Sequence, residues 1–163
     1  TPTVAILNNG TEEHKGTPVE VEAYKLLSAD ARINFVGNME SKTVMSSPCD
    51  VLVTDGFTGN VFLKTVEGMS KFFLNELKGV FLSGTLSKLA YLCVKKPLHD
   101  MKNSFDASEY GGAPLLGLKK PVIKAHGSAD ATAIKNAVRQ AIKFIESDVN
   151  GKIENALLTP ETE

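Results

Sequence analysis

The chain has 163 residues, of which 42% are hydrophobic and 23% are charged, and its formal net charge is −1. A charge so close to zero gives no general attraction for nucleic acid, and we expect no nucleic-acid partner. No run reaches the roughly 18–20 uninterrupted apolar residues that a membrane-spanning helix needs. These features are typical of a soluble globular domain with a real core.

The first half of the chain alternates strand and helix signals. Apolar runs predict strands at residues 4–7, 33–36 and 51–54. Thr17 and Pro18 are typical of a helix start, and a polar turn or short helix near residues 40–45 separates the second and third strands. This order predicts an α/β fold, with a mainly parallel sheet and helices on both of its faces.

A long helical pattern begins at Thr58, with apolar residues at three- and four-residue spacing as far as about residue 78. Gly79 and Gly84 interrupt it, and a second helix with a kink at Pro97 follows. We predict a helical hairpin at about residues 60–105 that projects from the body. Its apolar corner is a candidate for peripheral contact with a membrane through Val80, Phe81, Leu82 and Leu86. A dimer interface or an inner core face is the alternative for most of these side chains.

The last part of the chain contains a glycine-rich loop at residues 106–118 and a predicted fourth strand at residues 121–125. An apolar stripe from Ile134 to Ile145 then predicts a helix, and a weaker helix leads to residue 158. We expect residues 1–158 to form the body and residues 159–163 a flexible tail. Because the chain opens almost directly into an apolar strand, we expect it to be a fragment of a longer protein.

A polar loop follows each of the four predicted strands, at residues 8–16, 37–38, 55–60 and 126–130. The carboxyl ends of parallel strands meet at one edge of the sheet, where ligands of open α/β proteins bind. Glycines there let the backbone approach a ligand, and free helix N–H groups attract anions. The segment around Asp55 fits neither the P-loop nor the dinucleotide fingerprint, so it predicts an anion site that is not a standard nucleotide site.

Each of these loops also has a purely structural explanation. Ser128 or Asp130 is suited to capping the helix that follows, and Asp55 is suited to holding its own loop by a side-chain turn. No metal-ligand spacing and no nucleophile motif occurs, so we expect no metal, no cofactor and no covalent acyl-enzyme. The remaining inventory suits direct transfer at a carbonyl or phosphate by positioning and electrostatic stabilisation.

Five motifs follow one another over nearly the whole chain. They are Leu7-Asn8-x-Gly10-Thr11-Glu12-Glu13-x-Lys15-Gly16, Phe35-Val36-Gly37-Asn38, Asp55-Gly56-Phe57-Thr58-Gly59-Asn60-Val61-x-Leu63-Lys64, Ser108-Glu109-Tyr110-Gly111-Gly112-Ala113-Pro114-Leu115-Leu116-Gly117 and His126-Gly127-Ser128-x-Asp130-Ala131. Any single one is weak, but together they resemble the phosphate acyltransferase (PlsX) family of bacterial phospholipid synthesis.

The resemblance implies that inorganic phosphate attacks the thioester of a fatty acyl–acyl carrier protein, which yields acyl phosphate and free carrier protein. It also implies a homodimeric fold like that of isopropylmalate dehydrogenase and phosphotransacetylase. The enzyme would be cytoplasmic and peripheral at the inner face of the membrane, where a glycerol-phosphate acyltransferase would take the product. The family chain is about twice as long, with a glycine-rich phosphate motif in an N-terminal half that this sequence lacks. We therefore expect this chain alone to be inactive.

On this hypothesis the catalytic residues are Lys15, Asn60 and His126. Lys15 and the amides around Gly59–Asn60 would hold phosphate near the thioester carbonyl, while Asn60, Asn38 or Ser128 would stabilise the oxyanion. Lys15 or His126 would protonate or orient the leaving thiol, and Asp55 would fix its loop. The positions expected to bind phosphate or substrate are Asn8, Gly10, Thr11, Asn38, Asp55, Gly56, Thr58, Gly59, Lys64 and Ser128.

Two other functions remain open. A phosphotransacetylase-like enzyme that acts on acyl-coenzyme A would share the fold and the anion loops. A non-catalytic module that binds a carrier protein or a membrane through the helical hairpin would show no phosphate site. A dinucleotide dehydrogenase is less well supported, because its glycine fingerprint is absent.

Overall fold

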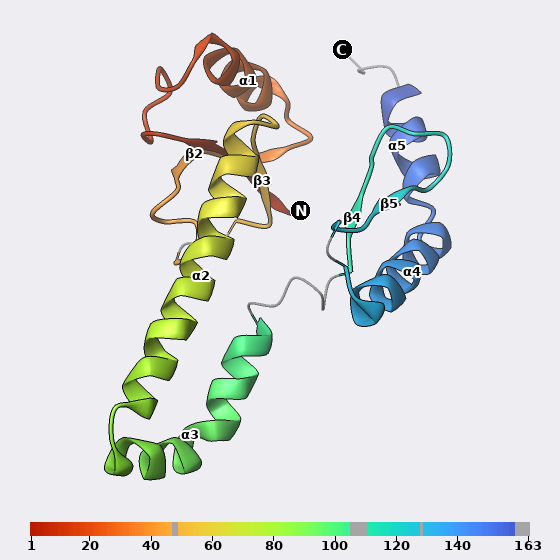
Figure 1. Ribbon diagram of the computed structural model, residues 1–163. Coiled ribbons are helices and arrows are strands. Elements are labelled where there is room, and N and C mark those ends of the chain that lie inside the picture. The colour runs from red at the N-terminus through yellow and green to blue at the C-terminus, as the bar shows by residue number, and fades with distance from the viewer. Residues whose placement is uncertain (47–48, 105–110, 128, 159–163) are drawn as a thin grey trace. The chain divides into compact units, whose positions relative to one another are not determined.

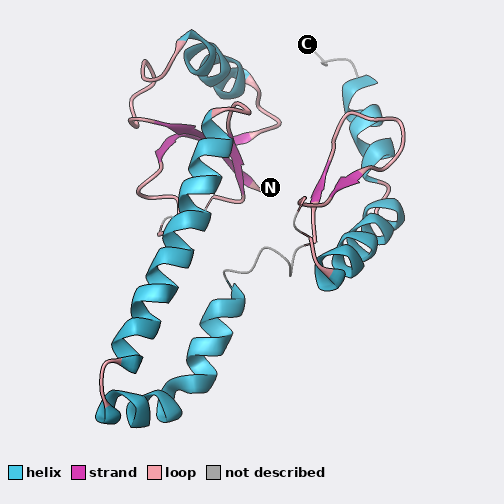
Figure 2. Cartoon of the chain, viewed as in Figure 1, coloured by secondary structure: helices cyan, strands magenta, loops and turns pink. Residues whose placement is uncertain are grey.

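The computed structural model describes residues 1–46, 49–104, 111–127 and 129–158. These residues form two compact units, Thr1–Asn75 and Glu76–Glu163, which we describe separately. The predicted tail at residues 159–163, Ser128 and the start of the glycine-rich loop lie outside the described residues. Both units combine helices with short strands (Figure 2).

The first unit is built on a three-stranded parallel sheet with β1 in the middle (Figure 1). In chain order its elements are β1 (Thr3–Asn8), α1 (Pro18–Ala29), β2 (Asn34–Glu40), β3 (Val51–Val53) and the larger part of α2 (Thr58–Leu82). The sheet order is β2-β1-β3, and both pairings are parallel. The predicted α/β character and parallel sheet are confirmed here, whereas a larger sheet of the isopropylmalate dehydrogenase type remains a prediction.

The core of the first unit lies on β1. Ala5, Ile6 and Leu7 are only 1%, 2% and 4% exposed, because both neighbouring strands and α1 pack around them. The ring of Tyr24 on α1 meets the ring of Phe35 on β2 edge to face, with centroids 5.1 Å apart. Because β1 is buried between β2 and β3, it fixes where the loops that follow β2 and β3 begin.

Helix α1 begins where the sequence predicted, at a complete capping box. The Thr17 hydroxyl accepts a hydrogen bond from the Val19 N–H, and the Glu20 carboxylate accepts one from the Thr17 N–H at 2.7 Å. Pro18 occupies the first helical position, where its missing N–H costs nothing. The loop after β1 is thereby closed at a fixed point.

Strand β2 is longer than predicted, and it includes Gly37 and Asn38. The expectation of a loop at residues 37–38 is wrong. Gly37 has a φ of +96°, a conformation that favours glycine, and the register between β1 and β2 shifts beside it. This irregularity lets the strand continue to Glu40 and places Asn38 opposite Ile6, with its side chain buried.

The second unit contains the last turns of α2, three further helices and two short strands among the described residues. They are α3 (Thr85–Ser104), β4 (Ala113–Pro114), β5 (Ile123–Lys124), α4 (Ala131–Glu146) and α5 (Val149–Leu158). The predicted fourth strand exists as β5, but it does not join the parallel sheet. It pairs antiparallel with β4 in a sheet of its own, since the short connection at residues 115–122 allows a hairpin and not a parallel crossover.

The glycine pair before β4 has a packing role. A Cβ atom on Gly111, whose φ is +79°, would lie 2.3 Å from the backbone nitrogen of Ala137 on α4. A Cβ on Gly112 would lie 2.6 Å from the carbonyl oxygen of Lys124 on β5. The two glycines therefore let this segment approach a helix and a strand at backbone distance.

Helix α2 continues through Gly79, so the predicted interruption there is wrong, and residues 80–82 form its last turn. Helix α3 is continuous through Pro97, and Figure 1 shows a bend partway along it, as expected for a proline within a helix. At the corner the rings of Phe81 and Tyr91 are 5.5 Å apart. Projection of a hairpin from the body remains a prediction.

Among the described residues, no helix combines the length and the apolar character needed to cross a membrane.

The junction between β3 and α2 depends on a close contact of Gly59. A Cβ atom there would lie 2.4 Å from Cγ2 of Thr54, whereas a Cβ on Gly56 would meet no atom within 4 Å. We predict that Gly59→Ala lowers the free energy of unfolding by about 1–3 kcal/mol, the usual cost of overpacking. Thr54→Ser removes Cγ2 and should restore most of this loss. Urea unfolding measures both, with Gly56→Ala as the control, and no rescue by Thr54→Ser would contradict the assignment.

Candidate active site

Three loops meet at the carboxyl edge of the parallel sheet. The strands β1, β2 and β3 all run in the same direction, so their ends bring residues 9–16, 41–46 and 54–57 to one edge. The helices α1 and α2 begin at this edge. Hydrogen bonds from Thr17 lower the pKa of Glu20, while the charge of Asp55 at the start of α2 acts in the opposite direction.

The loop at residues 9–16, here called the β1 loop, is held by two asparagine side chains. Asn8 donates a hydrogen bond from Nδ2 to the carbonyl of Lys15 at 3.0 Å, and Asn38 donates one from Nδ2 to the carbonyl of Glu12 at 2.8 Å. The Lys15 N–H donates to the same Glu12 carbonyl at 3.1 Å. Each asparagine thus uses one of the two N–H donors of its amide group to hold the backbone of the loop.

Lys15 is the cation that the β1 loop presents. Its aliphatic stem lies over Gly10, where a Cβ would be 3.0 Å from its Cγ. The charges of Lys15 and His14 help a backbone hydrogen bond to lower the pKa of Glu12. Within the described residues, no hydrogen bond or ion pair engages the Lys15 ammonium.

The start of α2 is occupied by its own acidic residue. One oxygen of Asp55 accepts hydrogen bonds from the N–H groups of Phe57 and Thr58, at 2.8 and 2.9 Å. Hydrogen bonds from the Thr58 side chain and backbone lower the pKa of the Asp55 carboxyl. Asp55 therefore fixes this loop with the N–H groups of Phe57 and Thr58, whereas the amides expected to hold phosphate, around Gly59–Asn60, do not bond to its carboxylate.

Asn60, in the first turn of α2, keeps its hydrogen-bond donors available. Gly59 donates its N–H to the carbonyl of Asp55 at 3.1 Å, but no hydrogen bond in the described part of the chain uses the backbone N–H or the side chain of Asn60. Asn60 is exposed in the first turn of α2. Asn60 is accordingly the donor that this helix start can offer to an anion.

Several predicted site residues lie elsewhere or have other partners. His126 and Asp130 follow β5, which belongs to the other unit and another sheet, so the expectation of four parallel strands with four loops on one edge is wrong. Asp130 accepts the N–H of Ala133 at 2.8 Å and caps α4. Lys64 pairs with Glu67 at 2.8 Å on the exposed side of α2. Thr11 and Gly56 are exposed in their loops, and Ser128 lies outside the described residues.

Two features of the site were missed by sequence reasoning. The carbonyl of Glu12 accepts two hydrogen bonds and is the centre of the β1 loop. Gly16, with a φ of +94°, closes the loop against Asn8, whose amide atoms lie 3.0 Å from the position of a Cβ. The position of Gly16 at the end of a polar loop was a usable signal in the sequence. Nothing in the sequence indicates that the carbonyl of Glu12 is the acceptor of both hydrogen bonds.

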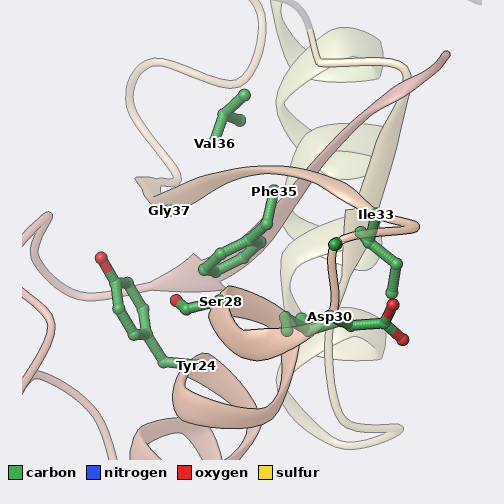
Figure 3. A pocket seen from close by; sticks show the side chains of 9 residues that line it. Tyr24, Ser28, Asp30, Ile33, Phe35, Val36 and Gly37 are labelled. Carbon is green, nitrogen blue, oxygen red and sulfur yellow. The ribbon is translucent and has the colours of Figure 1, made fainter. Parts of the chain in front are cut away.

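A separate cavity of about 420 Å³ opens between α1 and β2. Figure 3 shows Tyr24, Ser28 and Phe35 facing this space, with Val36 on the opposite side of the strand. Asp30 beside it is bound by Arg32, whose guanidinium holds the pKa of that carboxyl at about 2. None of the predicted site residues lines the cavity.

In the described ranges, no three His, Cys, Asp or Glu side chains gather as a metal site would require. The chemistry that this edge offers consists of an ammonium, an exposed amide side chain and a backbone N–H. These groups can bind and orient an anion or stabilise a developing negative charge on oxygen.

Comparison with known proteins agrees with the motifs. Residues 1–152 match the model of a family described as "Fatty acid synthesis protein". A protein of Brevibacillus brevis named phosphate acyltransferase is 50% identical over 156 residues, which cover 96% of this chain and 46% of that protein.

Two other relatives with this name give similar values. The Lactococcus lactis subsp. cremoris protein is 45% identical over 153 residues, and that of Oceanobacillus iheyensis is 50% identical over 152 residues. Each alignment covers 93% of this chain and 46% of the relative, so the chain spans about half the length of the relatives it matches. By the extent of these matches, the chain belongs to the fatty acid synthesis protein (PlsX) family.

Proposed function

We propose that the full-length protein containing this chain is a phosphate acyltransferase that transfers a fatty acyl group from acyl carrier protein to inorganic phosphate. Its relatives carry the name phosphate acyltransferase, and the chain shares their sequence over almost all of its length. The observation that carries the proposal is the β1 loop, which presents Lys15 at the carboxyl edge of a parallel sheet, with no partner for its ammonium among the described residues. Open α/β proteins bind ligands at this edge.

The proposed reaction needs one nucleophile and one leaving group. A phosphate oxygen attacks the thioester carbon, the C–S bond breaks, and the sulfur leaves as a thiolate that takes up a proton. Lys15 would bind the phosphate, and Asn60 would donate hydrogen bonds to the oxyanion that forms on the thioester oxygen. Lys15 would also protonate or orient the leaving thiol.

The charge at this edge suggests that the described residues form half of the site. Glu12, Glu20 and Asp55 all lie there as carboxylates, and they oppose the binding of a phosphate that carries between one and two negative charges. The same loops also carry Glu13 and Lys42, so the acids at this edge still outnumber the lysines. We infer that the additional length of the full-length protein supplies further donors or cations, and that this chain alone does not turn over substrate.

Substitutions at the two free donors test the proposed function. In the full-length protein, Lys15→Ala should reduce acyl-phosphate formation by roughly 100-fold or more, and Asn60→Ala by a comparable factor for a lost oxyanion donor. Acyl phosphate can be trapped with hydroxylamine and quantified, with inorganic phosphate and a fatty acyl–acyl carrier protein as substrates. Lys64→Ala is the control, since Lys64 is paired with Glu67.

Near-normal turnover in both Lys15→Ala and Asn60→Ala would remove these residues from the mechanism. Turnover that prefers acyl-coenzyme A over acyl carrier protein would favour the phosphotransacetylase-like alternative. Binding of carrier protein with no acyl phosphate from any donor would favour the non-catalytic module.

The proposal includes a cytoplasmic homodimer that touches the inner face of the membrane, where a glycerol-phosphate acyltransferase would receive the product. Its support is the corner between α2 and α3, where Val80, Leu82 and Leu86 are 62%, 57% and 80% exposed. Lys78 and Lys88 flank these side chains, a combination that suits an anionic lipid surface.

The corner can be tested by vesicle flotation. We expect the full-length protein to bind vesicles that contain anionic lipid, and the double variant Phe81→Ser/Leu82→Ser to lose most of this binding because less apolar area can be buried. The double variant Leu157→Ser/Leu158→Ser changes two leucines of α5 that are more exposed than Leu82, and it should bind normally. Undiminished binding by Phe81→Ser/Leu82→Ser would contradict the assignment.

A further inference from the structure

We propose that Asn38 is a positioning residue for Lys15, and that it acts through the main-chain carbonyl of Glu12. This inference rests on the proposed function and assigns Asn38 a role different from substrate binding. The side chain of Asn38 is buried, at 8% exposed, and its NH₂ group donates to the β1 loop.

The hydrogen bonds form a short path from β2 to the lysine. Asn38 Nδ2 donates to the Glu12 carbonyl at 2.8 Å, and the N–H of Lys15 donates to the same oxygen at 3.1 Å. On its other side, the carbonyl of Lys15 accepts from Asn8 Nδ2 at 3.0 Å. The carbonyl of Lys15 is therefore held directly by Asn8 of β1, and its N–H is held by the Glu12 carbonyl, which Asn38 of β2 holds in turn.

The orientation of the Asn38 amide follows from its partner. A backbone carbonyl only accepts hydrogen bonds, so the nitrogen of the amide must face Glu12. This leaves Oδ1 of Asn38 buried, with no donor in the described part of the protein. An unpaired buried acceptor costs stability, so packing alone would favour an apolar residue here, and the donor function of the side chain explains its presence better.

The path of hydrogen bonds from Asn38 ends at Lys15, whose ammonium must be positioned accurately if it binds phosphate. An ammonium that binds phosphate must lie close to the attacking oxygen, and a shift of about 1 Å can reduce the rate by about 100-fold. Asn38→Asp keeps the shape of the side chain but replaces the donor with a carboxylate facing the Glu12 carbonyl. Repulsion between these oxygens should displace the loop and, with it, Lys15.

A double-mutant cycle in the full-length protein tests this coupling. With inorganic phosphate and fatty acyl–acyl carrier protein as substrates, Asn38→Asp should reduce kcat/KM for phosphate by about 100-fold. In the Lys15→Ala background the same substitution should cost less than about threefold, because the group it positions is absent. Asn38→Ala should show the same pattern, and it keeps the test valid if Asn38→Asp fails to fold.

Asn136→Asp is the matched control. Asn136 is as buried as Asn38, at 8% exposed, but it lies on α4 in the other unit. Any effect of Asn136→Asp should be the same with and without Lys15. A full effect of Asn38→Asp in the Lys15→Ala background would overturn the proposal, since Asn38 would then act on the structure or the substrate directly.

Hydrogen exchange separates this proposal from the proposed function. The Lys15 backbone amide should exchange at least tenfold faster in Asn38→Asp than in the wild-type protein, and it should be unchanged in Asn136→Asp. Unchanged exchange of this amide in Asn38→Asp would overturn the positioning role. Absence of acyl phosphate with the wild-type protein would instead reject the proposed reaction, while faster exchange would still support the hydrogen-bonded path.

Discussion

The burial of β1 between two parallel neighbours is the constraint on which the first unit depends. Ala5, Ile6 and Leu7 are almost completely buried, so β1 cannot slip relative to β2 and β3 without exposing them. Because all three strands run in the same direction, the polar residues that follow them meet at one edge. The same pairing places Asn38 of β2 within reach of the β1 loop, and Thr54 against the start of α2.

The electrostatics of this edge differ from those of a simple helix-terminus anion site. Helix N–H groups attract anions when they are free. Here Glu20 caps the start of α1 and Asp55 caps the start of α2, so the charge of each helix end is already balanced. What remains for a ligand is the Lys15 ammonium and the donors of Asn60. A site of this kind fits a chain that spans about half the length of its relatives.

The sequence predicted the elements with strong periodicity and failed where geometry depends on distant partners. The three parallel strands, the start of α1 at Thr17 and the long helix from Thr58 follow from apolar spacing and capping residues. The continuation of β2 through Gly37 depends on a positive φ beside a register shift, and local composition does not show this. Likewise β5 reads as a core strand, but its pairing with β4 is decided by a short connection. The positions of Asn8 and Asn38 were predicted, whereas the atoms to which their amides bond were not.

The central claim is that inorganic phosphate binds at the carboxyl edge of the parallel sheet, beside Lys15 and Asn60. The most direct measurement is a titration of the ¹⁵N-labelled full-length protein with inorganic phosphate, followed by NMR at the Lys15 ammonium and the Asn60 backbone amide. We predict saturable shifts at both positions with one common dissociation constant, and no saturable shift at the Lys64 ammonium. Saturable binding of phosphate that leaves Lys15 and Asn60 unshifted would contradict this placement of the site.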